Sequence, residues 1–322
     1  MSHRLALLAL ALCAFGIGTT EFAPMGLLSE IASDLHISIP VAGFLISAYA
    51  IGVFVGAPVL TLSGSRVPRK AFLLGMMGIF VVGNILAAVS STYEMLLSAR
   101  VITALIQGPF LGVGAVVAGR LVPPGKQASA IATMFGGLAL ANVVGVPFQT
   151  WFGQVSGWRS TFWLTSFIGL VAIALLGAAL PKQPRDGAAK IVHELTVLRR
   201  PAVLLALLVT VLSSGGMFTV MTYIAPILEH AGGIQSKAIG PLLVLLGLGF
   251  TLGGWLGGRI RDEQVDRSLA VILFRCGHPG SICLHHALTD RGRRHPFHLG
   301  SYLVCNAASA ANSHRDASIR RA

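Results

Sequence analysis

The chain has 322 residues, of which 54% are hydrophobic and only 11% are charged. Soluble domains carry about 25% charged residues, so this composition excludes a chain that covers itself with a polar surface and indicates one that lies in lipid. The formal net charge of +12 does not indicate a nucleic-acid binder, because long apolar segments separate the Lys and Arg residues instead of leaving them on one solvated face.

Eight apolar segments are long enough to cross a bilayer, whose hydrocarbon core requires about 20 helical residues. The first follows a charged start, as in a signal peptide, but it continues without a small-residue cleavage site, so we expect an uncleaved first helix. The pattern predicts an all-α membrane protein. The segments cover residues 5–28, 41–62, 71–91, 95–118, 127–152, 160–180, 203–227 and 238–258.

The positive charges between these segments predict the orientation of the chain. Fourteen Lys and Arg residues lie in the N-terminus and the loops on its side, whereas the opposite loops hold only Arg159 and Lys237. Cytoplasmic loops are the ones rich in Lys and Arg. We therefore expect the N-terminus in the cytoplasm.

A polar segment and an internal repeat predict two halves. At an offset of 197 residues, three glycines of the second segment match three of the eighth, and Gly18 matches Gly215. Parallel repeats of this kind build many transporters. We expect a six-helix bundle in residues 1–180, a cytoplasmic linker in 181–202 and a partial second bundle in 203–274. The matched glycines are Gly43, Gly52 and Gly56 with Gly240, Gly249 and Gly253.

The last segment, residues 275–322, changes in composition where an apolar helix has just begun. It holds three of the four Cys, six of the ten His and seven Arg, with no Lys. A frameshifted or truncated reading after Phe274 explains this change together with the missing four spans, and a natural cytoplasmic tail is the alternative. Its thiol and imidazole groups suit zinc, but their spacing matches no usual zinc pattern, so we expect no metal. The candidate ligands are Cys276, His278, Cys283, His285 and His286.

Several stretches between residues 8 and 274 resemble one transporter family. They include "GTTEFAPMGLLSEIASDL", "VAGFLISAYAIGVFVGAP", "SARVITALIQGPFLGVGAVVAG", "ANVVGVPFQTW" and "GWRSTFW". The chain is similar to the major facilitator superfamily, in the drug/proton antiporter branch near the sugar-efflux and chloramphenicol-resistance exporters. The resemblance implies a bacterial-type inner membrane, a complete six-helix N-terminal half plus two helices of the second, and a small molecule bound near the midplane and exchanged for protons.

Two charged residues within spans are the candidates for proton coupling. The resemblance places Arg100 in the family's membrane-arginine motif, and an Arg inside a span needs a partner or water. Glu21 lies at a similar depth, so either side chain could satisfy the other. We expect Glu21 to take up and release a proton while Arg100 favours its charged form. A fixed ion pair, or a solvated Glu near the outer surface, is the alternative.

A cytoplasmic loop, "TLSGSRVPRK", resembles the family's latch between helices. Arg66, Arg69 and Lys70 match that pattern, but the acidic residue is missing. The corresponding "GRIRDE" in the second half keeps Gly258 and Asp262. We expect these residues to control the conformation of the transporter. The alternative is that the cations are ordinary positive charges of cytoplasmic loops.

The fifth span resembles the antiporter motif, in which small residues and proline let two helices approach and bend. Gly137, Gly145 and Pro147 fit it, and helix packing alone is the alternative. Three polar residues in spans are candidates for the substrate cavity, or else make interhelical hydrogen bonds. These three are Gln107, Asn142 and Gln149.

Enzymatic chemistry has no support in this sequence. It holds no Ser/His/Asp set, zinc-protease motif or phosphate-binding loop, so we expect no enzyme, no cofactor and no use of ATP. The sequence predicts a proton-coupled exporter of drugs or sugars, which alone exports poorly because part of its second half is missing. The alternative is a truncated membrane protein that binds a full-length transporter and blocks it. Neither substrate nor oligomeric state can be predicted.

Overall fold

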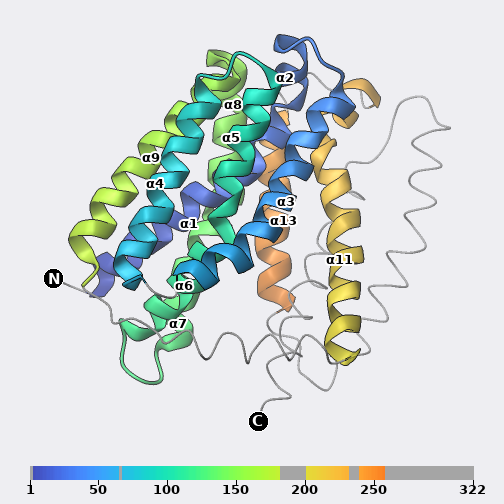
Figure 1. The fold of residues 1–322 in the computed structure, drawn as a ribbon. Helices are drawn as coiled ribbons and strands as arrows, with labels where there is room; N and C mark the ends of the chain where they lie inside the picture. Colours follow the sequence, from blue (N-terminus) through green and yellow to red (C-terminus); the bar gives the residue numbers. More distant parts are fainter. Residues whose placement is uncertain (1–2, 65–66, 182–200, 232–238, 258–322) are drawn as a thin grey trace. The chain divides into compact units, whose positions relative to one another are not determined.

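The computed structural model describes residues 3–64, 67–181, 201–231 and 239–257 (Figure 1). The regular structure in these ranges is helical throughout, which confirms the all-α prediction. The chain divides into two compact units, Met1–Val192 and His193–Ala322. Arg66, Gly258, Asp262 and the predicted tail lie outside the described residues.

The first unit contains most of the described helices. They are α1 (His3–Gly26), α2 (Leu28–Asp34), α3 (Ile39–Gly64), α4 (Arg69–Ala88), α5 (Tyr93–Leu105), α6 (Gln107–Arg120), α7 (Gln127–Leu140), the π-helical turn η1 (Ala141–Gly145), α8 (Val146–Ser156) and α9 (Trp158–Ala179). The second unit contains α11 (Pro201–Thr222), α12 (Ile224–Pro226), the π-helical turn η3 (Ile227–Ala231) and α13 (Ile239–Gly257).

Six described helical segments are long and apolar enough to cross a membrane. They are α1, α3, α4, α5 with α6, α7 with η1 and α8, and α9, and they coincide with the first six predicted spans. The seventh and eighth predicted spans coincide with α11 and α13. The first span begins and ends two residues earlier than predicted, because α1 ends at Gly26 and a separate short helix, α2, follows Leu27.

Proline breaks the fourth span where the sequence predicted a continuous helix. The ring of a helical proline clashes with the carbonyl four residues earlier, and four residues before Pro109 is Leu105, the last residue of α5. A second helix, α6, begins at Gln107. A Cβ on Gly56 of α3 would collide with the Leu105 carbonyl oxygen, so α3 passes directly against this break.

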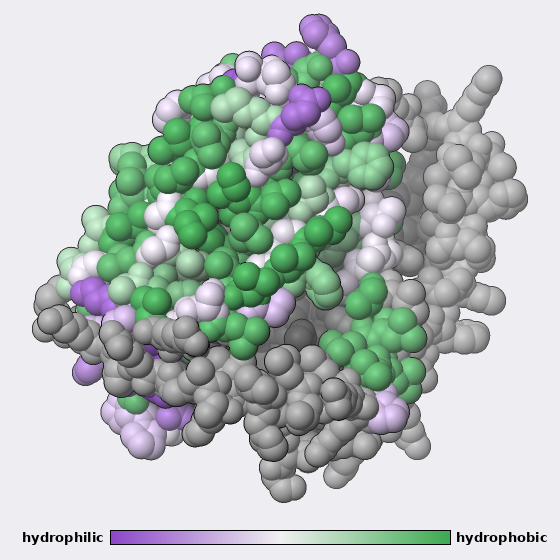
Figure 2. Space-filling view, in the orientation of Figure 1, coloured by the Kyte–Doolittle hydropathy of each residue, from purple (hydrophilic) through white to green (hydrophobic). Residues whose placement is uncertain are grey.

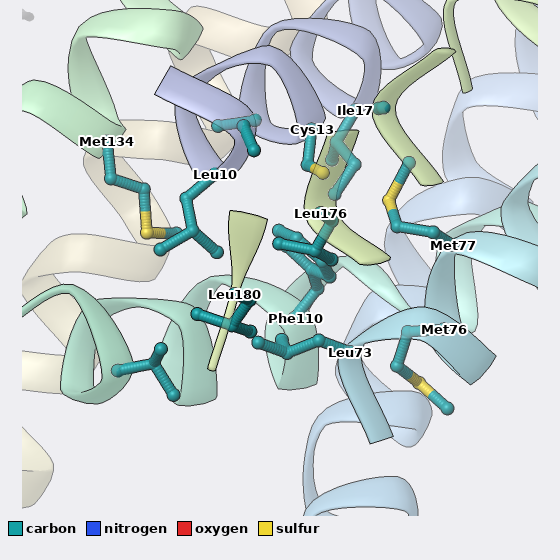
Figure 3. Close-up of a cluster of buried hydrophobic side chains, with 14 of the residues drawn as sticks. Leu10, Cys13, Ile17, Leu73, Met76, Met77, Phe110, Met134, Leu176 and Leu180 are labelled. Atoms are coloured by element: carbon teal, nitrogen blue, oxygen red, sulfur yellow. The ribbon is translucent and has the colours of Figure 1, made fainter. Parts of the chain in front are cut away.

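The interior of the first unit is a cluster of buried aliphatic, aromatic and sulfur-containing side chains (Figure 3). Lipid is as apolar as these side chains, so their close packing, more than their removal from water, holds the helices together. The cluster joins α1, α4, α6, α7 and α9. Its labelled members are Leu10, Cys13, Ile17, Leu73, Met76, Met77, Phe110, Met134, Leu176 and Leu180.

The outer surface of the first unit is also apolar. Figure 2 shows hydrophobic side chains along the length of its helices and hydrophilic ones gathered toward their ends. Phe54 is 81% exposed and Val155 is 70% exposed. Monomeric soluble proteins rarely expose large apolar patches, so this surface is suited to a lipid bilayer.

Candidate functional site

Arg100 is the largest fully buried side chain among the described residues, with 1% of its surface exposed. Its Nη1 donates a hydrogen bond of 2.7 Å to the carbonyl oxygen of Thr20, and its Nη2 donates one of 3.4 Å to the carbonyl oxygen of Glu21. The guanidinium carbon also lies 4.2 Å from the ring centre of Tyr49. Two main-chain carbonyls and an aromatic face therefore compensate this buried cation.

The sequence of α1 explains why a main-chain carbonyl is available to Arg100. In a helix the carbonyl of Thr20 would accept a hydrogen bond from the N–H four residues later. That residue is Pro24, which has no N–H. A buried carbonyl requires a donor, and Arg100 of α5 provides it.

The carboxylate of Glu21 binds a side chain other than Arg100. Glu21 is partly exposed, and its Oε2 accepts a hydrogen bond of 2.9 Å from Nε2 of Gln107. The Oε1 of Gln107 in turn accepts one of 2.6 Å from the hydroxyl of Tyr49. Gln107 is placed here because it is the first residue of α6, directly after the break in the fourth span.

Within the part of the chain that the structure describes, no ion pair joins Arg100 to the carboxylate of Glu21. The predicted neighbours do lie together, but the guanidinium binds the main chain of residue 21 while the carboxylate binds a neutral amide. The fixed ion pair that the sequence left open is thus not formed. The proton-carrying role of Glu21 stays a prediction.

A second buried polar contact fixes the same stretch of α1 to α4. The hydroxyl of Thr20 donates a hydrogen bond of 2.9 Å to Oδ1 of Asn84, whose Nδ2 donates one of 2.8 Å to the carbonyl of Phe80. Thr20 is 1% exposed and Asn84 is fully buried. Neither Asn84 nor Tyr49 was among the predicted site residues, although each is a polar residue inside an apolar span.

The other two predicted cavity residues have partners elsewhere. Gln149 is 2% exposed, and its Nε2 donates a hydrogen bond of 2.7 Å to Oγ1 of Thr165 in α9. Asn142 is partly exposed and donates to the carbonyl of Leu138 within its own span. Gln149 therefore makes the interhelical hydrogen bond named as the alternative, and a substrate contact by either residue stays a prediction.

The predicted antiporter motif lies where α7 and η1 pack closely against α1. A Cβ on Gly137 would collide with the carbonyl oxygen of Ala11, and a Cβ on Gly145 would lie 2.6 Å from Oγ1 of Thr19. Pro147 is buried in the first turn of α8, directly after the π-helical turn. Small residues let these backbones meet, so the packing role is formed, and a conformational role stays a prediction.

The predicted latch is described only in part. Arg69 begins α4 and is 8% exposed. The Nζ of Lys70 donates a hydrogen bond of 2.6 Å to the carbonyl of Gly177 in α9. Lys70 therefore links α4 to α9, and α4 begins at the same end of the unit as the N-terminus of α1 (Figure 1).

A polar cluster at the opposite end of the unit joins the end of α2, the start of α9 and the connection that follows α4. Nη1 of Arg159 donates a hydrogen bond of 2.6 Å to Oδ2 of Asp34, and its Nε donates one of 2.9 Å to the carbonyl of Ser90. Nε1 of Trp158 donates to the same Asp34 oxygen, at 3.1 Å. The hydrogen bond from Arg159 lowers the pKa of Asp34 below its usual range.

The family model and two relatives that match this chain describe membrane transporters or resistance proteins of one family. The family model described as "Major Facilitator Superfamily" matches residues 10–291, which extends past Phe274. The chain is 49% identical to the "Inner membrane transport protein YdhP" of Escherichia coli K12 over 268 residues, which are 83% of this chain and 69% of that protein. It is 36% identical to a "Chloramphenicol resistance protein" of Streptomyces lividans, over 84% of this chain and 70% of that protein.

Solved structures show the same architecture. A bacterial homologue of the human lysosomal transporter Spinster is similar with a TM-score of 0.73 and 16% identity, covering 97% of this chain and 73% of that one. A D-xylose–proton symporter is similar with a TM-score of 0.69 and 15% identity, covering 97% of this chain and 81% of that one. At these identities the similarity shows the fold alone.

Proposed function

The chain belongs to the Major Facilitator Superfamily, and we propose that it exports small molecules, drugs or sugars, in exchange for protons carried by Glu21. The family consists of membrane transporters, which agrees with the prediction that the chain is not an enzyme. The bilayer and a small-molecule substrate follow from the family. Export, proton coupling and the role of Glu21 belong to the proposal.

One observation carries the proposal, namely that Arg100 and the Glu21 carboxylate have separate partners. Carbonyl oxygens and the Tyr49 ring compensate the cation. Among the described residues, the carboxylate accepts its hydrogen bond from a neutral amide, at 2.9 Å. Removing one member of a buried ion pair is costly, because the other charge is left unpaired. Here Glu21 can be neutralised by a proton without leaving Arg100 unpaired.

The position of Glu21 and one relative support the same proposal. An ionisable residue inside a membrane span is a functional candidate by default, and Glu21 combines that position with partial exposure. The name of one relative, a chloramphenicol resistance protein, fits export. The cytoplasmic N-terminus and the two-half domain bounds are part of this proposal.

Exchange in liposomes tests the proposal. The purified chain is reconstituted with a pH-sensitive dye inside, and chloramphenicol is then applied as a gradient across the membrane. Wild type should move protons against the drug, and Glu21→Gln should abolish this movement. Glu94→Gln is the matched control, because Glu94 is an exposed carboxylate in the first turn of α5.

Two results would count against the proposal. Proton movement by Glu21→Gln equal to that of wild type would exclude Glu21 as the proton carrier. Absence of any drug-dependent proton movement in wild type would reject exchange of this drug by this chain, and co-purification with a full-length transporter would then identify it as a binding partner.

A further inference from the structure

We propose that Tyr49 positions Glu21 through the Gln107 amide, as one hydrogen-bond chain whose direction reverses when Glu21 takes up a proton. The inference rests on the proposed function and deepens it, since it assigns positioning roles to Gln107, which binds the proton carrier, and to Tyr49, which binds Gln107. The three side chains come from α3, α6 and α1. Proton uptake at one helix would therefore change hydrogen bonds on two others.

In the described structure the hydrogen bonds of this chain run from Tyr49 through Gln107 to Glu21. The Tyr49 hydroxyl donates to Oε1 of Gln107 at 2.6 Å, which leaves the amide Nε2 to donate to Oε2 of Glu21 at 2.9 Å. An ionised carboxylate can only accept hydrogen bonds. The observed arrangement thus suits the ionised form of Glu21.

The same three groups can satisfy the protonated form with the opposite direction. A protonated carboxyl group is a donor, a glutamine amide presents either an acceptor or a donor after a half-turn, and a phenol hydroxyl both donates and accepts. Glu21 would then donate to Oε1 of Gln107, and Nε2 would donate to the Tyr49 oxygen. An aliphatic residue at position 107 could serve neither form.

Arg100 holds the far end of this chain in place. Its guanidinium lies 4.2 Å from the centre of the Tyr49 ring, and Tyr49 is 3% exposed. Since the ring is held between packing and a buried cation, its hydroxyl stays within reach of Gln107 in either direction. Tyr49 is therefore more than a packing residue, because its hydroxyl decides which end of the amide faces Glu21.

Few charged groups among the described residues act on Glu21. Among the described residues, the titratable or charged groups that act on it are Tyr49 from α3 and Arg100 from α5. The polar side chain from α6 is the neutral amide of Gln107. On α9 the charged residue is Arg159, which binds Asp34 at the end of the unit. The amide is thus the hydrogen-bond partner whose orientation can follow the proton.

Infrared difference spectroscopy can read this chain without requiring transport. The purified chain is titrated in detergent, and the carboxyl C=O band that disappears in Glu21→Gln reports the protonation of that residue. Tyr49→Phe removes only the hydroxyl and keeps the ring on Arg100, whereas Gln107→Leu removes the amide. Tyr93→Phe is the matched control, because its hydroxyl donates to the Val41 carbonyl at 2.9 Å and does not touch Glu21.

Tyr49→Phe and Gln107→Leu should both shift the midpoint of this band, in the same direction, because both deprive Glu21 of a fixed amide donor. The expected shift is about 0.5–1 pH unit, or about three- to tenfold in the protonation constant. Tyr93→Phe should leave the midpoint unchanged. If Gln107→Leu does not fold, Tyr49→Phe with its control still decides the question.

The outcomes separate the inference from the function beneath it. A Glu21 band that titrates in wild type, with an unchanged midpoint in Tyr49→Phe, would overturn the positioning role and leave proton uptake by Glu21 standing. Shifts in opposite directions for the two variants would overturn it as well. A wild type in which no Glu21 band titrates would remove the proton carrier, and both proposals would fail together.

Discussion

Replacing Gly137 by alanine should destabilise the first unit, whereas the same change at the adjacent Gly136 should not. A Cβ on Gly137 would collide with the carbonyl oxygen of Ala11 and lie 3.0 Å from the main-chain nitrogen of Phe15. A Cβ on Gly136 would meet nothing within 4 Å. The pair therefore isolates the contact between α7 and α1, since both residues lie in the same helix.

The magnitude follows from the two environments. Because the colliding atoms at Gly137 belong to the main chain, they cannot rotate away, and overpacking of this kind costs about 1–3 kcal/mol. Alanine at Gly136 gains at most about 1 kcal/mol, through its higher helix propensity. The two variants should therefore differ by about 1–4 kcal/mol in the free energy of unfolding.

Tryptophan fluorescence during unfolding in detergent would measure this difference. Gly136→Ala should unfold with wild type or later, and Gly137→Ala earlier. Equal stability of the two variants would refute the reasoning, because it would show that α1 and α7 can separate without cost. Loss of stability in both would mean that the glycines matter for a reason other than this contact.

Two further predictions concern polar contacts. Asn84→Ala leaves the buried hydroxyl of Thr20 without its side-chain partner and should cost about 1–3 kcal/mol. In a double-mutant cycle with Thr20→Val, additive losses would contradict this. The pKa of Asp34 is lower in the folded state than in the unfolded state, where it is about 3.9. Its bond with Arg159 therefore stabilises the fold above pH about 3.9, and this contribution is lost as the pH falls through the pKa of the folded state. Because both side chains are substantially exposed, Asp34→Asn should cost only roughly 0.5–1 kcal/mol at neutral pH and nothing in acid, and an undiminished cost at low pH or in high salt would count against it.

The spans could be predicted from sequence because lipid imposes a length and an apolar composition on each of them. The break inside the fourth span was missed, although Pro109 marks it, whereas a bend in the fifth span was expected from Gly145 and Pro147. Pro109 stands four residues after the end of α5, and Pro147 follows the π-helical turn η1. A hydropathy pattern shows how apolar a segment is, but it does not show where the main-chain hydrogen bonds of a helix are interrupted.

The candidate site was predictable in its charged members and not in their partners. Glu21 and Arg100 stand out because ionisable residues are rare in spans. The hydrogen bond from Tyr49 to Gln107 depends on how α3 crosses the fourth span, which no periodicity encodes. The carbonyl of Thr20 could not be singled out by residue type, since every residue carries one, and only the spacing to Pro24 distinguishes it.

The main-chain acceptor for Arg100 affects how this site can change during evolution. Almost any residue at position 20 would present the same carbonyl oxygen, so the side chain of Thr20 is constrained by Asn84 and not by the cation. A scan of α1 by side-chain replacement would consequently overlook it. The residue that makes this carbonyl available is Pro24, because proline has no N–H to donate to it.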